Sequence, residues 1–326
     1  MRKETVEPAI TTPGIHHVTA ICGDPQANVD FYASVLGLRL VKRTVNFDDP
    51  TTYHLYYGDE VGHPGTILTF FPWPGAPRGV RGTGQTTATA FAVPPGSLDW
   101  WTDRLARSAT RFEKTEERFG ERVLPLRDPD DLAIELVERR DAAERPWWEA
   151  GPVTAPYALR GFHGVTLTLE GYERTAALLT DVMGLEPASQ QENRWRYAAA
   201  QRGAGAMVDL ICAPGLRAGR VAVGTVHHVA FRCATDAEQT AWQRRLADAG
   251  MNVTPVLDRQ YFRSIYFREP GGVLFEIATD PPGFTRDEAP EALGNTLRLP
   301  PWLEPRRTYI EDRLPRLQVP AAVRAT

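Results

Sequence analysis

The stretch Gly14-Ile-His-His-Val-Thr-Ala-Ile-Cys22 has two later counterparts, Gly161-Phe-His-Gly-Val-Thr-Leu-Thr168 and Thr225-Val-His-His-Val-Ala-Phe-Arg-Cys233. Each is a short run of β-branched and apolar residues, which predicts a strand. A fourth, weaker copy begins at Thr86-Thr-Ala-Thr-Ala-Phe-Ala-Val93. Because internal self-similarity marks a repeated structural unit, we interpret the chain as four copies of one unit.

Each copy continues from this strand into a helix and then into further strands. The segments with apolar residues at helical spacing are 29–36, 98–105, 175–182 and 239–246. Three of them stop at a glycine, Gly37, Gly184 or Gly250, as a left-handed C-terminal cap requires. After two intervening strands, the last strand of each copy is expected at 65–71, 131–137, 205–211 and 272–278. The unit is therefore β-α-β-β-β.

A half-open sheet of four strands cannot bury both of its faces alone, so the units must pair. We therefore predict an α+β fold in which four βαβββ units form two half-open, barrel-like domains. In chain order, units one and two occupy a first region, 14–140, and units three and four occupy a second region, 159–282. Beyond Pro281 the chain becomes rich in proline and arginine, which predicts an extended C-terminal tail over 283–326.

Composition and charge exclude several classes of function. The 326 residues are 42% hydrophobic and 24% charged with a net charge of −4, which gives no basic surface for nucleic acid. The polar N-terminus lacks the apolar segment of a signal peptide, and no apolar run reaches the roughly 20 residues of a membrane span. Cys22, Cys212 and Cys233 lie in apolar, strand-like runs and are expected to be buried free thiols. We therefore expect a cytoplasmic protein that binds neither nucleic acid nor membrane.

One position in the first strand and one in the last strand of each unit carry polar, mostly ionisable side chains. From unit one to unit four, the pairs are His17 and Thr69, Thr87 and Glu135, His163 and Asp209, and His228 and Glu276. A carboxylate inside an apolar run such as that around Glu276 is costly unless a cation or hydrogen-bond donors face it. Two imidazoles and one carboxylate form a facial triad, which leaves positions open on Fe(II) for O2 and substrate. A structural zinc site would need a fourth ligand, usually cysteine, and no cysteine pair is suitably spaced.

The repeats leave open which units pair, and the pairing decides the composition of the site. If unit three pairs with unit four, the site has four ligands and suits glyoxalase-like isomerisation; they are His163, Asp209, His228 and Glu276. If unit one pairs with unit four, the ligands are His17, His228 and Glu276, with Thr69 as a non-ligand. His163 then lies in the other, metal-free cavity with Thr87, Glu135 and Asp209.

Further motifs surround these positions. They are Ile15-His-His-Val-Thr, Val41-Lys-Arg-Thr, Tyr53-His-Leu-Tyr-Tyr, Gly62-His-Pro-Gly-Thr, Arg160-Gly-Phe-His, Val226-His-His-Val-Ala-Phe and Pro270-Gly-Gly-Val-Leu-Phe-Glu. On these motifs, residues 14–282 resemble the vicinal-oxygen-chelate (glyoxalase/bleomycin-resistance/extradiol dioxygenase) superfamily, and within it the ring-cleaving hydroquinone dioxygenases. The resemblance implies that unit one pairs with unit four, so that His17, His228 and Glu276 bind the metal. It also implies Fe(II), with Mn(II) as the other ion suited to these ligands.

The resemblance implies that O2 opens the ring of a hydroquinone- or catechol-type diol and that both oxygen atoms enter the product. Tyr266, His227 and Arg259 are the expected catalytic residues. Tyr266 would donate a hydrogen bond, His227 would shuttle a proton, and Arg259 would neutralise a hydroxyl or ring substituent. His16, next to His17 in the chain, and Thr19, on the same strand face as His17, are expected to bind substrate or orient ligands.

Three aromatic residues, Phe70, Phe71 and Trp73, are expected to wall an aromatic pocket. A homo-oligomer is expected for this family. Two other functions occur in the superfamily and stay open at this point. A glyoxalase-like isomerase or lyase would use Zn or Ni with a fourth protein ligand and would consume no oxygen, and a small-molecule binding protein would need no metal.

Overall fold

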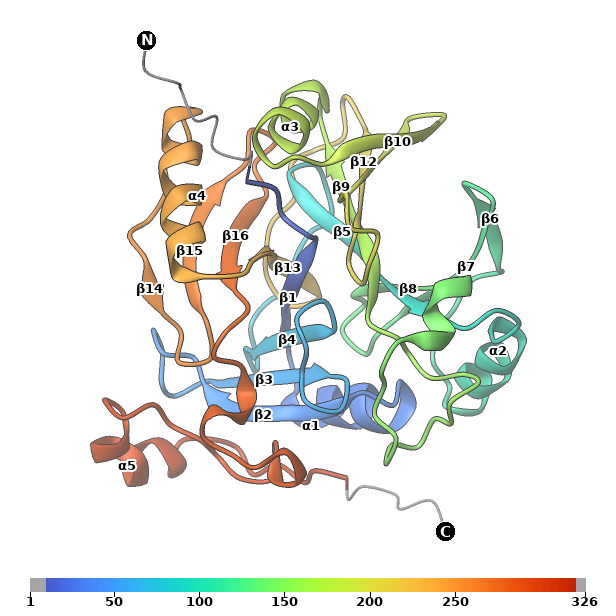
Figure 1. Ribbon diagram of the computed structural model, residues 1–326. Coiled ribbons are helices and arrows are strands. Elements are labelled where there is room, and N and C mark those ends of the chain that lie inside the picture. The colour runs from blue at the N-terminus through green and yellow to red at the C-terminus, as the bar shows by residue number, and fades with distance from the viewer. Residues whose placement is uncertain (1–9, 321–326) are drawn as a thin grey trace.

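Two eight-stranded sheets, standing side by side, form the body of the protein (Figure 1). The structure is a computed structural model and describes residues 10–320. The strands of the first sheet, in spatial order, are β14 (Leu257–Asp258), β15 (Arg263–Arg268), β16 (Leu274–Thr279), β13 (Thr225–Cys233), β1 (Ile15–Cys22), β4 (Ile67–Pro72), β3 (Tyr53–Gly58) and β2 (Arg39–Val45). Those of the second sheet are β10 (Glu186–Gln191), β11 (Arg194–Ala198), β12 (Met207–Cys212), β9 (Phe162–Leu169), β5 (Gln85–Val93), β8 (Ala133–Glu138), β7 (Glu121–Arg127) and β6 (Glu116–Arg118). The predicted α+β fold of four βαβββ units in two half-open sheets is confirmed.

The first sheet joins the two ends of the chain. It combines unit one (β1 to β4) with unit four (β13 to β16), whereas the second sheet combines units two and three. Within each unit the first strand runs parallel to the last strand, as a helical crossover between them permits. The two halves of the first sheet meet at the antiparallel pair β1 and β13, where Thr19 lies opposite His228. This is the pairing of units that the resemblance implied.

The helices pack apolar side chains against the sheets. Trp101 of α2 (Leu98–Arg107) and Trp242 of α4 (Asp236–Asp248) are fully buried. In units one and three the helix is not regular, because α1 (Pro25–Val29) and α3 (Glu173–Ala177) each continue into a π-helical turn, 30–35 and 178–182. Such a turn adds one residue to the helical repeat, which apolar periodicity in a short segment does not reveal.

The predicted glycine caps are confirmed by the backbone. Gly37, Gly184 and Gly250 have φ of 73°, 75° and 81°, a left-handed conformation that side chains with a Cβ rarely adopt. Two of these positions are also crowded: a Cβ would lie 2.6 Å from Val153 at Gly37 and 2.4 Å from Thr11 at Gly184. Glycine therefore ends the helix and lets another segment approach it.

The C-terminal tail runs along β2 and α1 at the edge of the first sheet (Figure 1). It is less extended than predicted, because it contains three short 3-10 turns and α5 (Arg307–Glu311), which buries Ile310. Its first part is anchored by Lys42 of β2, whose fully buried ammonium group pairs with Asp287 and Glu288. The tail is therefore packed firmly against the first sheet rather than loosely wrapped on it.

No helix within residues 10–320 is both long enough and apolar enough to cross a membrane. The three cysteines are free thiols, as predicted. Cys22 and Cys233 are buried, whereas Cys212, the last residue of β12, is partly exposed.

Candidate metal centre

Three side chains converge inside the first sheet. The Nε2 atoms of His17 (β1) and His228 (β13) are 3.2 Å apart, and Oε2 of Glu276 (β16) lies 3.3 Å from the first and 3.0 Å from the second. All three side chains are buried, and their ligand atoms lie within 4.8 Å of one another. Among residues 10–320, no other group of three His, Cys, Asp or Glu side chains meets this spacing.

The strand register explains how residues far apart in the sequence meet. Glu276 lies beside Ala230 in the parallel pair β13 and β16, and Ala230 follows His228 by two residues, so both side chains point to one face. His17 reaches the same face across the antiparallel seam, where the register shifts on either side of it. The carboxylate is held from its other side by Ser264 of β15, whose hydroxyl donates to Oε1.

The donor set fits a divalent cation. Oε2 of Glu276 is buried without a hydrogen-bond donor, although both Nε2 atoms lie close to it. Each ligand imidazole is instead engaged through Nδ1, which lies 2.9 Å from Nδ1 of His16 for His17 and 2.8 Å from Nδ1 of His227 for His228. If the ligands carry their protons on Nδ1, both Nε2 lone pairs face the carboxylate oxygen, an arrangement that a cation among them would satisfy.

The pKa shifts of Glu276 and His228 both arise within this buried centre. Burial opposes ionisation of Glu276, but the neighbouring His17 and His228 outweigh it and hold the pKa of the carboxyl well below its ordinary value. Burial lowers the pKa of His228. The carboxylate of Glu276 therefore stays ionised, which is the form that binds a metal.

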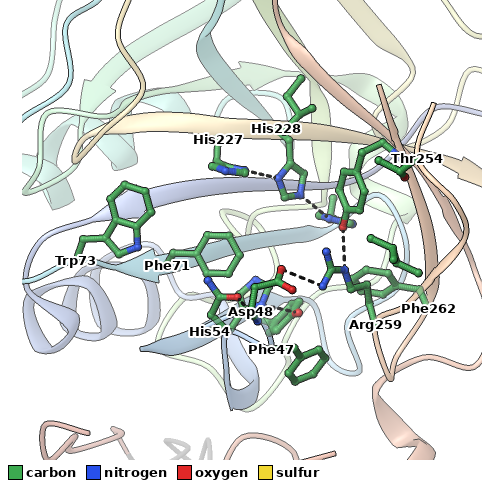
Figure 2. Close-up of a pocket in the computed structure, with 16 residues that line it drawn as sticks. Phe47, Asp48, His54, Phe71, Trp73, His227, His228, Thr254, Arg259 and Phe262 are labelled. Carbon is green, nitrogen blue, oxygen red and sulfur yellow. Dashed lines mark hydrogen bonds and ion pairs between the residues drawn. The ribbon is translucent and has the colours of Figure 1, made fainter. Parts of the chain in front are cut away.

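The centre opens into a cavity of about 350 Å³ (Figure 2). It is lined by His17, Asn46, Phe47, Asp48, His54, Tyr56, Phe71, Trp73, His227, His228, Thr254, Leu257, Arg259, Phe262, Tyr266 and Leu274. Twelve of these sixteen side chains are leucine or carry an aromatic ring, histidine included, and the other four are Asn46, Asp48, Thr254 and Arg259. This composition is typical of a site for a small aromatic molecule.

The three residues predicted to be catalytic all line this cavity. Nε of Arg259 lies 3.2 Å from the hydroxyl of Tyr266, and Nη1 of Arg259 lies 3.2 Å from Oδ2 of Asp48 (Figure 2). Burial raises the pKa of Tyr266, so this hydroxyl keeps its proton at neutral pH. Burial lowers the pKa of His227 to about 3, which leaves this imidazole neutral.

The two residues predicted to bind substrate lie behind the cavity wall. His16 and Thr19 are buried and do not line the cavity. His16 contacts His17 through Nδ1, and Thr19 accepts a hydrogen bond of 2.9 Å from the hydroxyl of Thr69. Of the expected aromatic wall, Phe71 and Trp73 line the cavity, whereas Phe70 points into the core. Strand alternation accounts for this difference, because Phe70 and Phe71 face opposite sides of β4.

Sequence reasoning missed two cavity residues on β3. His54 and Tyr56 lie within a motif that drew attention only for its resemblance, yet they share a strand face and both reach the cavity. The register held a signal for one of them: Tyr56 lies opposite Thr69, as Tyr266 lies opposite Glu276. Comparing a third position in units one and four would have singled out Tyr56.

The equivalent cavity of the second sheet is filled by ion pairs. Arg118 donates to Glu135 at 2.9 and 3.1 Å, and Arg196 donates to Asp209 at 2.7 and 3.0 Å. His163 lies there too, 3.3 Å from Glu121, and the remaining space is only about 10 Å³. Guanidinium groups therefore neutralise the carboxylates at this centre, and no room for a substrate is left.

The chain is similar in sequence to a known family and to several of its individual members. A family model described as "Glyoxalase/Bleomycin resistance protein/Dioxygenase superfamily" matches residues 14–136 and 161–277. The "Putative ring-cleaving dioxygenase MhqO" of Bacillus subtilis is 52% identical over 303 residues, which cover 93% of this chain and 96% of that protein. The "Chlorohydroquinone/hydroquinone 1,2-dioxygenase" of Sphingobium indicum is 38% identical over 299 residues, with 89% and 92% covered.

Solved structures agree with the fold. A crystal structure described as a "putative dioxygenase" from Bacillus subtilis superposes with a TM-score of 0.91 at 50% identity and covers 96% of this chain and 99% of its own. Glyoxalase I from Zea mays superposes with a TM-score of 0.61 at 14% identity, covering 82% of this chain and 92% of its own. The similarity to glyoxalase I, at 14% identity, shows only that the two proteins share a fold.

Proposed function

The chain belongs to the glyoxalase/bleomycin resistance protein/dioxygenase superfamily, and from this premise we propose that it is a ring-cleaving dioxygenase for a hydroquinone- or catechol-type diol. The observation that carries the proposal is the buried triad of His17, His228 and Glu276 at the end of an aromatic-lined cavity. Three protein ligands leave several positions of an octahedral ion free, enough for a diol and O2 together. In unit one, the position equivalent to Glu276 is occupied by Thr69, whose hydroxyl is hydrogen-bonded to His54 and Thr19. This position therefore does not supply the fourth protein ligand that a glyoxalase would use.

We assign His17, His228 and Glu276 as the residues that would hold Fe(II), with Mn(II) as the alternative. The ion, when bound, lowers the pKa of a coordinated hydroxyl and lets electrons pass from the diol to O2. His16 and His227 contact the two ligand imidazoles at Nδ1, and these contacts would hold each ring in the orientation that directs Nε2 at the ion. We assign to His16 and Thr19 the orientation of this centre, since neither reaches the cavity.

The polar wall of the cavity binds and protonates the substrate in this proposal. The guanidinium of Arg259 supplies the positive charge that a deprotonated diol needs, and it holds the hydroxyl of Tyr266 at 3.2 Å. Tyr266 remains protonated at neutral pH and can donate a hydrogen bond to an oxygen of the substrate. His227 is neutral and lies at the cavity surface, and if its Nδ1 accepts from His228, its Nε2–H is left to donate a hydrogen bond in the cavity.

Replacing Tyr266 by phenylalanine tests this assignment. We expect kcat to fall by about 100-fold, the lower range for loss of one general acid or hydrogen-bond donor, while iron content stays at the wild-type level. Steady-state oxygen uptake and iron per chain, measured on the same preparation, decide the outcome. Tyr197→Phe, which removes a hydroxyl from the second sheet, serves as control and should stay within about twofold of wild type. A kcat of Tyr266→Phe equal to that of Tyr197→Phe would remove Tyr266 from the mechanism.

The function itself is tested by anaerobic reconstitution with Fe(II), followed by oxygen-electrode traces. The substrates are hydroquinone, catechol, and their chlorinated and methylated derivatives. We expect one O2 to be consumed for each diol opened and both oxygen atoms to appear in the product when ¹⁸O2 is used. Absence of oxygen uptake with every diol would overturn the proposal. The free thiols are compatible with a reducing compartment, and we place the enzyme in the cytoplasm as part of the same proposal.

A further inference from the structure

The two walls of the cavity are equivalent by position and different in chemistry. In unit four, Tyr266 lies opposite Glu276, and in unit one, Tyr56 lies opposite Thr69. Two residues before each tyrosine, on the same strand face, are Ser264 and His54. In unit four, the short side chain of Ser264 therefore bonds the long side chain of Glu276, which reaches the metal centre. In unit one, the long side chain of His54 bonds the short side chain of Thr69, and the imidazole of His54 forms part of the cavity wall.

Hydrogen bonds fix the His54 ring at both nitrogens. Thr69 donates its hydroxyl proton to Thr19, so its oxygen is left to accept from Nε2 of His54 at 2.7 Å. That assignment places the proton of His54 on Nε2, and Nδ1 then accepts from the hydroxyl of Tyr56 at 2.8 Å. Burial raises the pKa of Tyr56 and lowers that of His54, which keeps the donor protonated and the imidazole neutral.

The cavity wall at His54 is therefore a neutral ring whose two nitrogens are both paired within the protein. Neither nitrogen is free to bind a metal or a hydroxyl, because each is already paired within the protein. The ring packs against two aromatic neighbours, with centroids 4.0 Å from Tyr56 and 4.3 Å from Phe71. On the unit-four side the cavity instead presents Arg259 and the hydroxyl of Tyr266. The wall at His54 and Phe71 is neutral and aromatic, whereas the wall at Arg259 and Tyr266 is charged and hydrogen-bonding.

We propose that His54 is a specificity-determining residue, which fixes the orientation of the aromatic ring and limits the size of its substituent. A substituted, apolar edge of the ring packs on His54 and Phe71, and one hydroxyl of the diol faces Arg259 and Tyr266. The inference rests on the proposed function for the kind of ligand. It differs from that function in naming the wall that separates small from bulky diols.

The first test enlarges the apolar wall by His54→Ala. We expect the ratio of kcat/KM for tert-butylhydroquinone to that for hydroquinone to rise by at least about 10-fold, since a changed apolar pocket shifts discrimination by 10- to 200-fold. Iron per chain should stay at the wild-type level, because no ligand is touched. A ratio within twofold of wild type, with both substrates affected in parallel, would overturn the proposal.

The second test keeps the ring and removes one tether at a time, by Thr69→Val and by Tyr56→Phe. We expect KM for hydroquinone to rise by about 3- to 10-fold, the effect of losing one hydrogen bond, with a smaller change in kcat. Tyr57→Phe is the matched control, because its hydroxyl bonds Asn28 on the opposite face of β3. An equal rise of KM in this control would show a general loosening of β3 and would contradict the proposed role. If His54→Ala does not fold, these two variants carry the test.

A binding measurement separates failure of this inference from failure of the proposed function. Dissociation constants of hydroquinone and tert-butylhydroquinone are measured anaerobically on Fe(II)-loaded wild type and Thr69→Val. A change in their ratio by threefold or more supports the role of His54 even if no diol causes oxygen uptake. An unchanged ratio overturns that role even if wild type consumes oxygen rapidly.

Discussion

Glu276→Gln should remove iron from the protein and abolish its oxygen uptake. Glu276 supplies the one anionic atom among the three proposed ligands, and its Oε2 is buried without a hydrogen-bond donor. An amide keeps the size of the side chain but loses the charge. We expect metal affinity to fall by more than about 100-fold, because even groups that only orient ligands are worth 10- to 100-fold. Iron per chain after anaerobic reconstitution and desalting measures the effect.

A matched control exists in the other sheet. Glu135 occupies the slot equivalent to Glu276, but its carboxylate is paired with Arg118. Glu135→Gln removes the same charge from an equivalent position and should leave iron content unchanged. Full iron binding by Glu276→Gln, or loss of iron from Glu135→Gln alone, would mean that the metal lies elsewhere.

Lys42→Met should destabilise the fold by about 3–5 kcal/mol, the range observed when one partner of a buried ion pair is removed. The ammonium group of Lys42 is fully buried, 2.6 Å from Oδ1 of Asp287, and it also contacts the fully buried Glu288. Arg298 contacts the other oxygen of Glu288 but is partly exposed, so it offsets only part of the loss. Methionine fills a similar volume, which limits the effect to the charge. The change is read from the midpoint of urea unfolding.

An exposed ion pair of the same tail provides the comparison. Arg307 contacts Glu304 and Glu311 on the surface of the protein, where pairs contribute at most about 1 kcal/mol. Arg307→Met should therefore leave the unfolding midpoint almost unchanged. The double variant with Lys42→Met and Glu288→Gln should recover part of the lost stability, because one buried charge disappears with its partner. Equal effects of Lys42→Met and Arg307→Met would contradict the anchoring role.

Much of the site was predictable because it follows from repetition. Comparing one position in the first strand and one in the last strand of all four units singled out His228 and Glu276. These two residues belong to one unit, so the β-α-β-β-β order of that unit is enough to bring them together. His17 lies 211 residues from His228, and their contact depends on which units pair across the central seam. Alternation along single strands is the same for either pairing, so the choice came from the resemblance and not from periodicity.

Other features depend on contacts that no local pattern records. Lysine is rarely buried, and the acidic partners of Lys42 lie 245 and 246 residues further along the sequence. His54 is fixed by Thr69 and Tyr56 through the register of three strands, which becomes visible only in the folded sheet. His16 and Thr19 were expected near the substrate, but His16 contacts His17 and Thr19 contacts Thr69, both away from the cavity.

Anomalous diffraction at the iron edge tests most directly whether one metal centre is built from the first and last units of the chain. Crystals of anaerobically Fe(II)-loaded protein should show one strong peak per chain, between Nε2 of His17, Nε2 of His228 and Oε2 of Glu276. The cavity of the second sheet, around His163 and Asp209, should show none. A peak in that second cavity, or no peak at the triad of a protein that consumes oxygen with a diol, would contradict the assignment of His17, His228 and Glu276 as the metal ligands.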